Sequence, residues 1–282
     1  MTWFSYTILA VFSYALYYIL SRVFLKAKDT DAISYAVLFN IVCASLLTAI
    51  ALNRGFVLVD LKEYAFNLVL MGILYTAAQI FIFQASKTIE ASELIILSST
   101  RVLWTIGAAL LFLGEDFNLA KVFGTALILF AVFFVSYKKK RVQFEKGHLY
   151  AILAGICLGL GFVNDAYILQ QADAFSYAAV VFIVPAILTV AIFPSAIGKI
   201  KNQLDIKLAR NTVLLGIFYS IGIMASYAAY QHGGTASQIV PIGQSVVIVT
   251  VLLAAIFIGE RDNLIKKLIA AVLVTLGVLL LK

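Results

Sequence analysis

The sequence is poor in charged residues, which make up 12% of its 282 positions, and it contains only 3 prolines, 2 cysteines and 2 histidines. A soluble domain carries about 25% charged residues, so this scarcity argues against a water-soluble fold. The cysteines and histidines show no metal-like spacing, and the H-E-x-x-H, G-x-S-x-G and Walker A motifs are absent. These absences predict no enzyme, no metal, no cofactor and no ATP-driven pump.

Long apolar runs are abundant, and hydrophobic residues make up 63% of the chain. A run of about 20 apolar residues crosses a bilayer as a helix, because a helix satisfies its own backbone hydrogen bonds. The sequence therefore predicts an all-α integral membrane protein in a lipid bilayer, with ten transmembrane helices. They are expected at residues 3–21, 32–52, 64–83, 92–113, 118–137, 148–168, 175–195, 211–231, 235–257 and 263–281.

The chain also repeats itself. "ASELIILSSTRVLWTIGAALLFLGEDFN" at 91–118 aligns with "ASQIVPIGQSVVIVTVLLAAIFIGERDN" at 236–263, "GILY" at 72–75 with "GIFY" at 216–219, and "SYAVLFNIV" at 34–42 with "SYAAVVFIV" at 176–184. The three segments recur in the same order and at a nearly constant distance along the chain. The chain is therefore predicted to consist of two repeated halves, 1–140 and 147–282. Five spans per half, an odd number, means that the repeats have inverted topology, an architecture typical of secondary transporters.

The net charge of +7 comes mostly from short loops between spans, which favours a topological origin over binding to nucleic acid. Most of the 21 lysines and arginines fall on one side of the predicted bundle, including the basic segment 138–146. The positive-inside rule then places these loops in the cytoplasm and both termini outside. We expect a multi-pass protein of the cell (plasma or inner) membrane, as a monomer or a homodimer.

Two glycine–glutamate boxes, "LGE" at 113–115 and "IGE" at 258–260, each precede the last span of a half. With the ten-span pattern, they make the chain resemble the EamA-like exporters of the drug/metabolite transporter superfamily. That resemblance implies export or exchange of small metabolites by alternating access without ATP. On local grounds the glycines are expected to end helices, each glutamate to favour the start of the following helix, and Asn118 and Asn263 to cap it. A gating role for Glu115 or Glu260 is the alternative.

Charged residues inside the predicted spans are costly in lipid and mark candidate functional sites. Arg101 lies within the fourth span, and its repeat mate is Val246. Its partner is expected to be Asp165, Glu93 or an anionic group of a substrate; a buried structural ion pair is the alternative role. Asp165 is either a solvated interfacial acid or a carrier of a proton or counter-charge for an amine. Glu93 is either an acid of the first helical turn, where the helix dipole favours it, or such a carrier.

Polar and aromatic residues within the spans complete the candidate site. Mid-span tyrosines need hydrogen-bond partners, and their rings can also wall a cavity or hold an organic cation. The predicted substrate-binding set is Arg101, Tyr14, Tyr17, Tyr75, Gln79, Asn164, Tyr227 and Gln244. An amino acid suits these groups, because it needs a positive partner, a negative partner and an apolar wall.

The leading hypothesis is therefore a secondary active transporter, acting as an exporter, of a small polar or zwitterionic metabolite such as an amino acid. Protons are the candidate coupling ion. Efflux of cationic amphiphilic drugs and a non-transporting membrane scaffold or lipid flippase subunit remain as alternatives.

Overall fold

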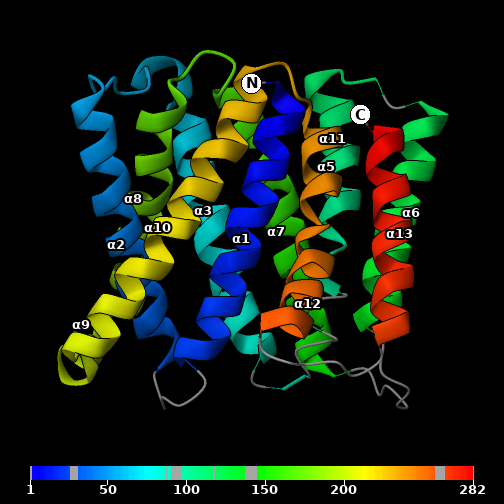
Figure 1. The fold of residues 1–282 in the computed structure, drawn as a ribbon. Helices are drawn as coiled ribbons and strands as arrows, with labels where there is room; N and C mark the ends of the chain where they lie inside the picture. Colours follow the sequence, from blue (N-terminus) through cyan, green and yellow to red (C-terminus); the bar gives the residue numbers. More distant parts are fainter. Residues whose placement is uncertain are drawn as a thin grey trace.

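The computed structural model describes residues 2–25, 31–86, 88–89, 94, 97–116, 118–136, 145–257 and 264–281. Its regular elements are all helices (Figure 1). They are α1 (Trp3–Leu25), α2 (Ala32–Asn53), α3 (Leu61–Ser86), α5 (Arg101–Ala108), the π-helix η1 (Ala109–Leu113), α6 (Leu119–Ser136), α7 (Lys146–Ile168), α8 (Ala174–Ile192), α9 (Ser195–Gln203), α10 (Ile206–Gln231), α11 (Ala236–Gly243), α12 (Val246–Phe257) and α13 (Leu264–Leu281).

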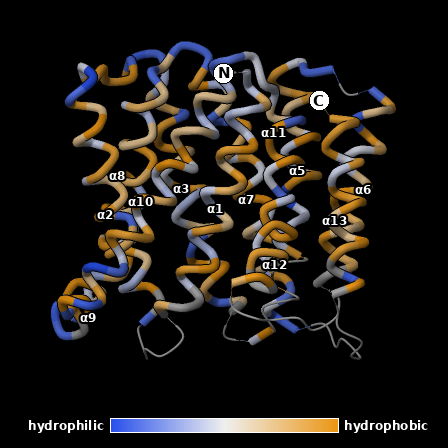
Figure 2. The backbone as a smooth tube through the Cα atoms, viewed as in Figure 1, coloured by the Kyte–Doolittle hydropathy of each residue, from blue (hydrophilic) through white to orange (hydrophobic). Residues whose placement is uncertain are grey.

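The helices run between two faces of one bundle, with hydrophobic residues along their length and hydrophilic residues gathered near the two faces (Figure 2). Both chain ends lie at the same face, which we call the terminal face (Figure 1). Among the described residues six helices are long and apolar enough to cross a membrane, namely α1, α2, α3, α7, α8 and α10. Shorter apolar helices occupy the other predicted spans. The all-α membrane fold is confirmed.

The two halves of the chain pack against each other helix by helix. In the four most extensive pairings, α3 lies beside α7, α1 beside α10, α2 beside α8, and α6 beside α13. Each pair takes one helix from each half, so the core of the bundle is also the interface between the repeats. Such an interface is where transporters with inverted repeats place their substrate site.

The sequence repeat recurs at the helix starts. Asp31 caps α2 by accepting hydrogen bonds from the Ser34 backbone N–H (3.1 Å) and hydroxyl (2.8 Å). Asp173 caps α8 in the same way, with distances of 2.8 Å to the Ser176 N–H and 2.7 Å to its hydroxyl. The Ser34 hydroxyl and the ion pair with Lys199 lower the pKa of Asp31.

The ninth span, predicted as one helix over 235–257, is instead broken into α11 and α12 at Gln244 and Ser245. Pro241 lies just before the break and has no N–H for the helical ladder, while Gly243 has a low helix propensity. The seventh span also ends earlier than predicted, and the separate helix α9 follows it.

The first glycine–glutamate box behaves partly as expected. Gly114 ends η1 in the left-handed conformation (φ 63°), and the Asn118 side chain caps α6 by accepting from the Lys121 N–H at 3.0 Å. The side chain of Glu115 binds a helix of the other half. Its two carboxylate oxygens accept from the N–H groups of Ala236 (2.7 Å) and Ser237 (2.8 Å), at the start of α11 in the other half. The second box and Asn263 lie outside the described residues.

Close contact between α5 and α7 depends on Gly159. A Cβ atom there would lie 2.7 Å from both the Arg101 carbonyl oxygen and Trp104 Cβ. Gly159→Ala is therefore expected to lower the melting temperature by about 3–10 °C, because the backbone of α5 would have to shift. Thermal unfolding in detergent checks this. Gly107→Ala is the control, since a Cβ on Gly107 would have no such neighbour within 4 Å; an equal loss in both variants would contradict the packing argument.

Candidate functional site

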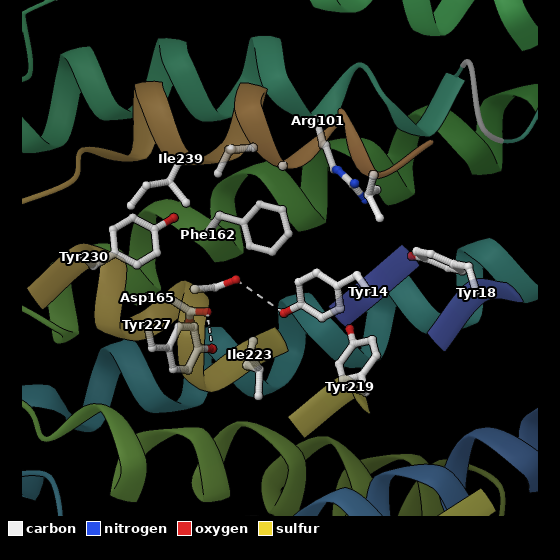
Figure 3. Close-up of a pocket in the computed structure, with 14 residues that line it drawn as sticks. Tyr14, Tyr18, Arg101, Phe162, Asp165, Tyr219, Ile223, Tyr227, Tyr230 and Ile239 are labelled. Atoms are coloured by element: carbon white, nitrogen blue, oxygen red, sulfur yellow. Dashed lines mark hydrogen bonds between the residues drawn. The ribbon is translucent and has the colours of Figure 1, made fainter. Parts of the chain in front are cut away.

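A cavity of about 140 Å³ lies between helices of both halves, from α1, α5, α7, α10 and α11 to the start of α12 (Figure 3). Most of its wall is aromatic or aliphatic, but it includes one arginine and one aspartate. The lining residues are Tyr14, Tyr18, Arg101, Phe162, Asp165, Tyr219, Ile223, Ser226, Tyr227, Tyr230, Ile239, Val240, Gly243 and Val246. A few polar groups in a mostly apolar wall are typical of small-molecule sites.

Asp165 carries the densest hydrogen-bond network of the cavity. Its carboxylate accepts hydrogen bonds from the hydroxyls of Tyr75 (2.5 Å), Tyr177 (2.6 Å) and Tyr227 (2.7 Å), which come from α3, α8 and α10. The residue is only 1% exposed, so its interpretation as a solvated interfacial acid is wrong. The last turn of α7 lies near the terminal face, but side chains from three other helices cover it.

The three tyrosines neutralise none of the charge on Asp165. Hydroxyls are neutral donors, and within the described part of the chain no lysine, arginine or histidine forms an ion pair with this carboxylate. An ionised carboxylate buried without a cation is costly unless a bound positive group or a proton compensates it. The arrangement therefore suits an amine or a proton.

Arg101 begins α5 and lies on a different wall of the cavity from Asp165 (Figure 3). We assign the Gln244 amide with its oxygen toward the guanidinium, because the opposite orientation would set N–H donors against each other. That oxygen accepts from Arg101 Nε at 2.6 Å and Nη2 at 3.1 Å. The guanidinium carbon lies 5.8 Å from the centroid of the Phe162 ring.

Among the described residues, this geometry leaves one edge of the guanidinium available. Gln244 occupies the edge formed by Nε and Nη2, so the edge formed by Nη1 and Nη2 keeps its outward N–H groups. A carboxylate binds such an edge through two parallel hydrogen bonds. Of the expected partners of Arg101, Asp165 forms no ion pair with it in the described structure, and Glu93 lies outside the described residues.

The structure brings some of the predicted site residues together and separates others. Tyr14, Arg101, Asp165 and Tyr227 line the cavity. Tyr75 and Gln244 adjoin it through Asp165 and Arg101.

The other predicted residues lie elsewhere. Tyr17 packs in an aromatic cluster with Phe39 and Tyr219. Gln79 pairs with Asn40 at 3.3 Å, and Asn164 accepts from Asn67 at 2.7 Å beside a separate cavity of about 580 Å³.

Tyr177, the fully buried partner of Asp165, is not among the predicted substrate-binding residues. A signal for it exists, since Tyr177 lies in the repeated "SYA" segment and is the repeat mate of Tyr35. Phe162, Ser226 and Tyr230 were also not in the predicted set. Nothing in their spacing distinguishes them from ordinary packing residues.

An all-helical membrane bundle with a mostly apolar cavity between two repeats is typical of secondary transporters. The chain belongs to the EamA-like transporter family, whose model matches residues 1–137 and again 145–282. A comparison with curated protein sequences finds no match. A solved structure described only as a crystal structure of a protein is similar over 98% of this chain and 97% of that chain, with a TM-score of 0.78 at 15% identity; it supports the fold alone.

Proposed function

We propose that this protein is a secondary active transporter that exports a small zwitterionic solute, such as an amino acid, by alternating access. The observation that carries the proposal is a pair of opposite charges, Asp165 and Arg101, on separate walls of one cavity with no ion pair between them. Asp165 would bind the amine, and the free edge of Arg101 would bind the carboxylate. Each bound group would compensate a charge that is costly at this depth.

The size of the cavity favours a small solute over a large amphiphile. Its volume of about 140 Å³ is close to the ~150 Å³ of an engineered cavity that holds benzene. The apolar side chain of a small amino acid fits against walls such as Phe162 and Ile223. A small organic cation is the second candidate, because Tyr227 and Tyr230 flank Asp165 and aromatic faces attract cations.

A ligand panel separates the two candidates. Thermal unfolding of the purified protein is measured with each amino acid, and then with the methyl ester and the N-acetyl derivative of the best one. A ligand that binds the folded state raises the melting temperature. We expect the zwitterion alone to stabilise the protein. Equal stabilisation by the ester would favour the cationic solute, and no stabilisation by any amino acid would exclude the proposed substrate class.

We further propose that the terminal face is outside the cell and that protons drive export. The distribution of lysine and arginine supports this orientation in the plasma or inner membrane. A reporter fused to the C-terminus tests it by accessibility from outside intact cells. Solute efflux from proteoliposomes, with and without a pH gradient, tests the coupling, and a chain that acts only as a scaffold would move no solute.

A further inference from the structure

A third cavity, of about 200 Å³, lies near the connection between α10 and α11, which Figure 1 places at the terminal face. It shares Tyr230 with the central cavity, and on α7 the adjacent residues Asp165 and Ala166 line one cavity each. Only a thin layer of side chains therefore separates the two spaces. The outer cavity is lined by Leu113, Glu115, Ala166, Leu169, Gln170, Tyr230, Gly233, Gly234 and Thr235.

Helix α11 forms part of this partition. Ile239 on α11 lines the central cavity, whereas Thr235, the residue just before α11, lines the outer one. The helix has only eight residues and is separated from α12 by the break at Gln244 and Ser245. A short helix that is not continuous with its neighbour can change its position without moving the whole span.

Two charged residues of the first half, Glu115 and Arg101, bind α11, one at each end. At its N-terminus the carboxylate of Glu115 accepts from the N–H groups of Ala236 and Ser237. At its C-terminus Arg101 binds the side chain of the C-cap residue Gln244. The helix dipole favours a negative charge at the N-terminus of α11, where Glu115 lies, and a positive charge at its C-terminus, where Arg101 lies. Thr235, the N-cap residue, forms no side-chain capping bond, so Glu115 supplies the cap from the other half.

We propose that the outer cavity is the vestibule through which the solute passes between the central cavity and the terminal face, and that α11, latched by Glu115, is the gate. In the structure the Glu115 carboxylate is hydrogen-bonded to the start of α11, which corresponds to the closed gate. Glu115, Gln170 and Thr235 offer oxygen acceptors in the vestibule, which suits a solute with an amine. The identity of the solute rests on the proposed function, whereas the gate does not.

The gate is tested by the accessibility of a cysteine placed in the central cavity. Cys43 and Cys157 are replaced by alanine and Ser226→Cys is introduced; proteoliposomes captured through a C-terminal tag present the terminal face outward. Labelling by an impermeant cationic methanethiosulfonate is followed by mass spectrometry. Glu115→Ala is expected to accelerate labelling about tenfold or more, because the hydrogen bonds to a charged acceptor are lost.

Asp116→Ala is the matched control, since Asp116 is the neighbouring acid, is exposed, and contacts Lys121 through its backbone oxygen. Glu115→Gln keeps one acceptor oxygen and is expected to give an intermediate rate, which preserves the test if Glu115→Ala does not fold. An unchanged rate in both Glu115 variants, or the same acceleration in Asp116→Ala, would overturn the gate.

The vestibule is tested in the same cysteine-free background. Gln170→Cys is expected to be labelled at least about tenfold faster than Ser226→Cys, because Gln170 lines the outer cavity and is exposed. Equal or slower labelling would overturn the vestibule. These measurements need no solute, so a failure of the proposed substrate class and a failure of the gate give different results.

Discussion

Replacing Arg101 with alanine is expected to weaken binding of the zwitterionic solute by about 30-fold or more, because removing one partner of a buried charge pair costs about 2–5 kcal/mol. The free edge of the guanidinium has no counterpart in the second half, where the repeat mate is Val246. No symmetric residue can therefore replace it. The dissociation constant from titration calorimetry is the measurement, on variants whose melting temperature shows that they fold.

Two further arginine variants separate the role of charge from that of geometry. Arg101→Lys keeps the charge but cannot contact Gln244 and a carboxylate through one planar group, so we expect about a tenfold loss. Arg54→Ala is the control, because Arg54 is an exposed arginine that packs over the Phe175 ring at 4.1 Å. It should leave binding unchanged. Full affinity in Arg101→Ala would show that Arg101 serves only to hold Gln244 and α11.

Asp165→Asn is expected to reduce binding of the same solute by about 100-fold or more, since the amine would lose its counter-charge in a site whose wall is mostly apolar. Asparagine has nearly the shape of aspartate. Its NH₂ group, however, would face tyrosine hydroxyls that now donate to the carboxylate at 2.5–2.7 Å. The measurement is again the dissociation constant, together with transport in proteoliposomes under an imposed pH gradient.

The pH gradient distinguishes an amine site from a proton site. If Asp165 carries only the proton, Asp165→Asn would still bind the solute and would lose the effect of the gradient, which would contradict the assignment to the amine. Asp173→Asn is the matched control, because Asp173 caps α8 and asparagine caps helices about as well as aspartate. It should change neither binding nor coupling.

The tyrosines around Asp165 are expected to contribute unequally. Tyr75→Phe, Tyr177→Phe and Tyr227→Phe each remove one hydrogen bond to a charged acceptor. Only Tyr227 also lines the cavity. We expect Tyr227→Phe to alter both solute affinity and stability, and the other two to lower mainly the melting temperature. Equal effects of all three on affinity would contradict this distinction.

Much of the fold could be predicted because membrane insertion depends on local composition. Each apolar run must form a helix to satisfy its own backbone in lipid, so the spans follow from the sequence alone. The Arg101 charge stands out for the same reason, because a charge within an apolar run is rare and costly. The break of the ninth span was missed, since Pro241 and Gly243 permit a break without requiring one.

The candidate site could be predicted only in part. Asp165, Tyr14 and Tyr227 stand out as polar or aromatic residues within apolar spans and meet in one cavity. Gln79 and Asn164 have the same appearance in the sequence, yet each pairs with another amide elsewhere. Residue type marks a side chain as needing a partner, but it does not say which helix provides that partner.

The sequence by itself determined the membrane environment, the duplication, and the asymmetric placement of Arg101, because these depend on the composition and order of single segments. Only the tertiary structure decided that three tyrosines from three helices contact Asp165, that Gln244 aligns Arg101, and that Glu115 caps a helix of the other half. Those contacts join residues far apart in the chain. They depend on how the helices of the two halves pack, which the pattern within any one segment does not specify.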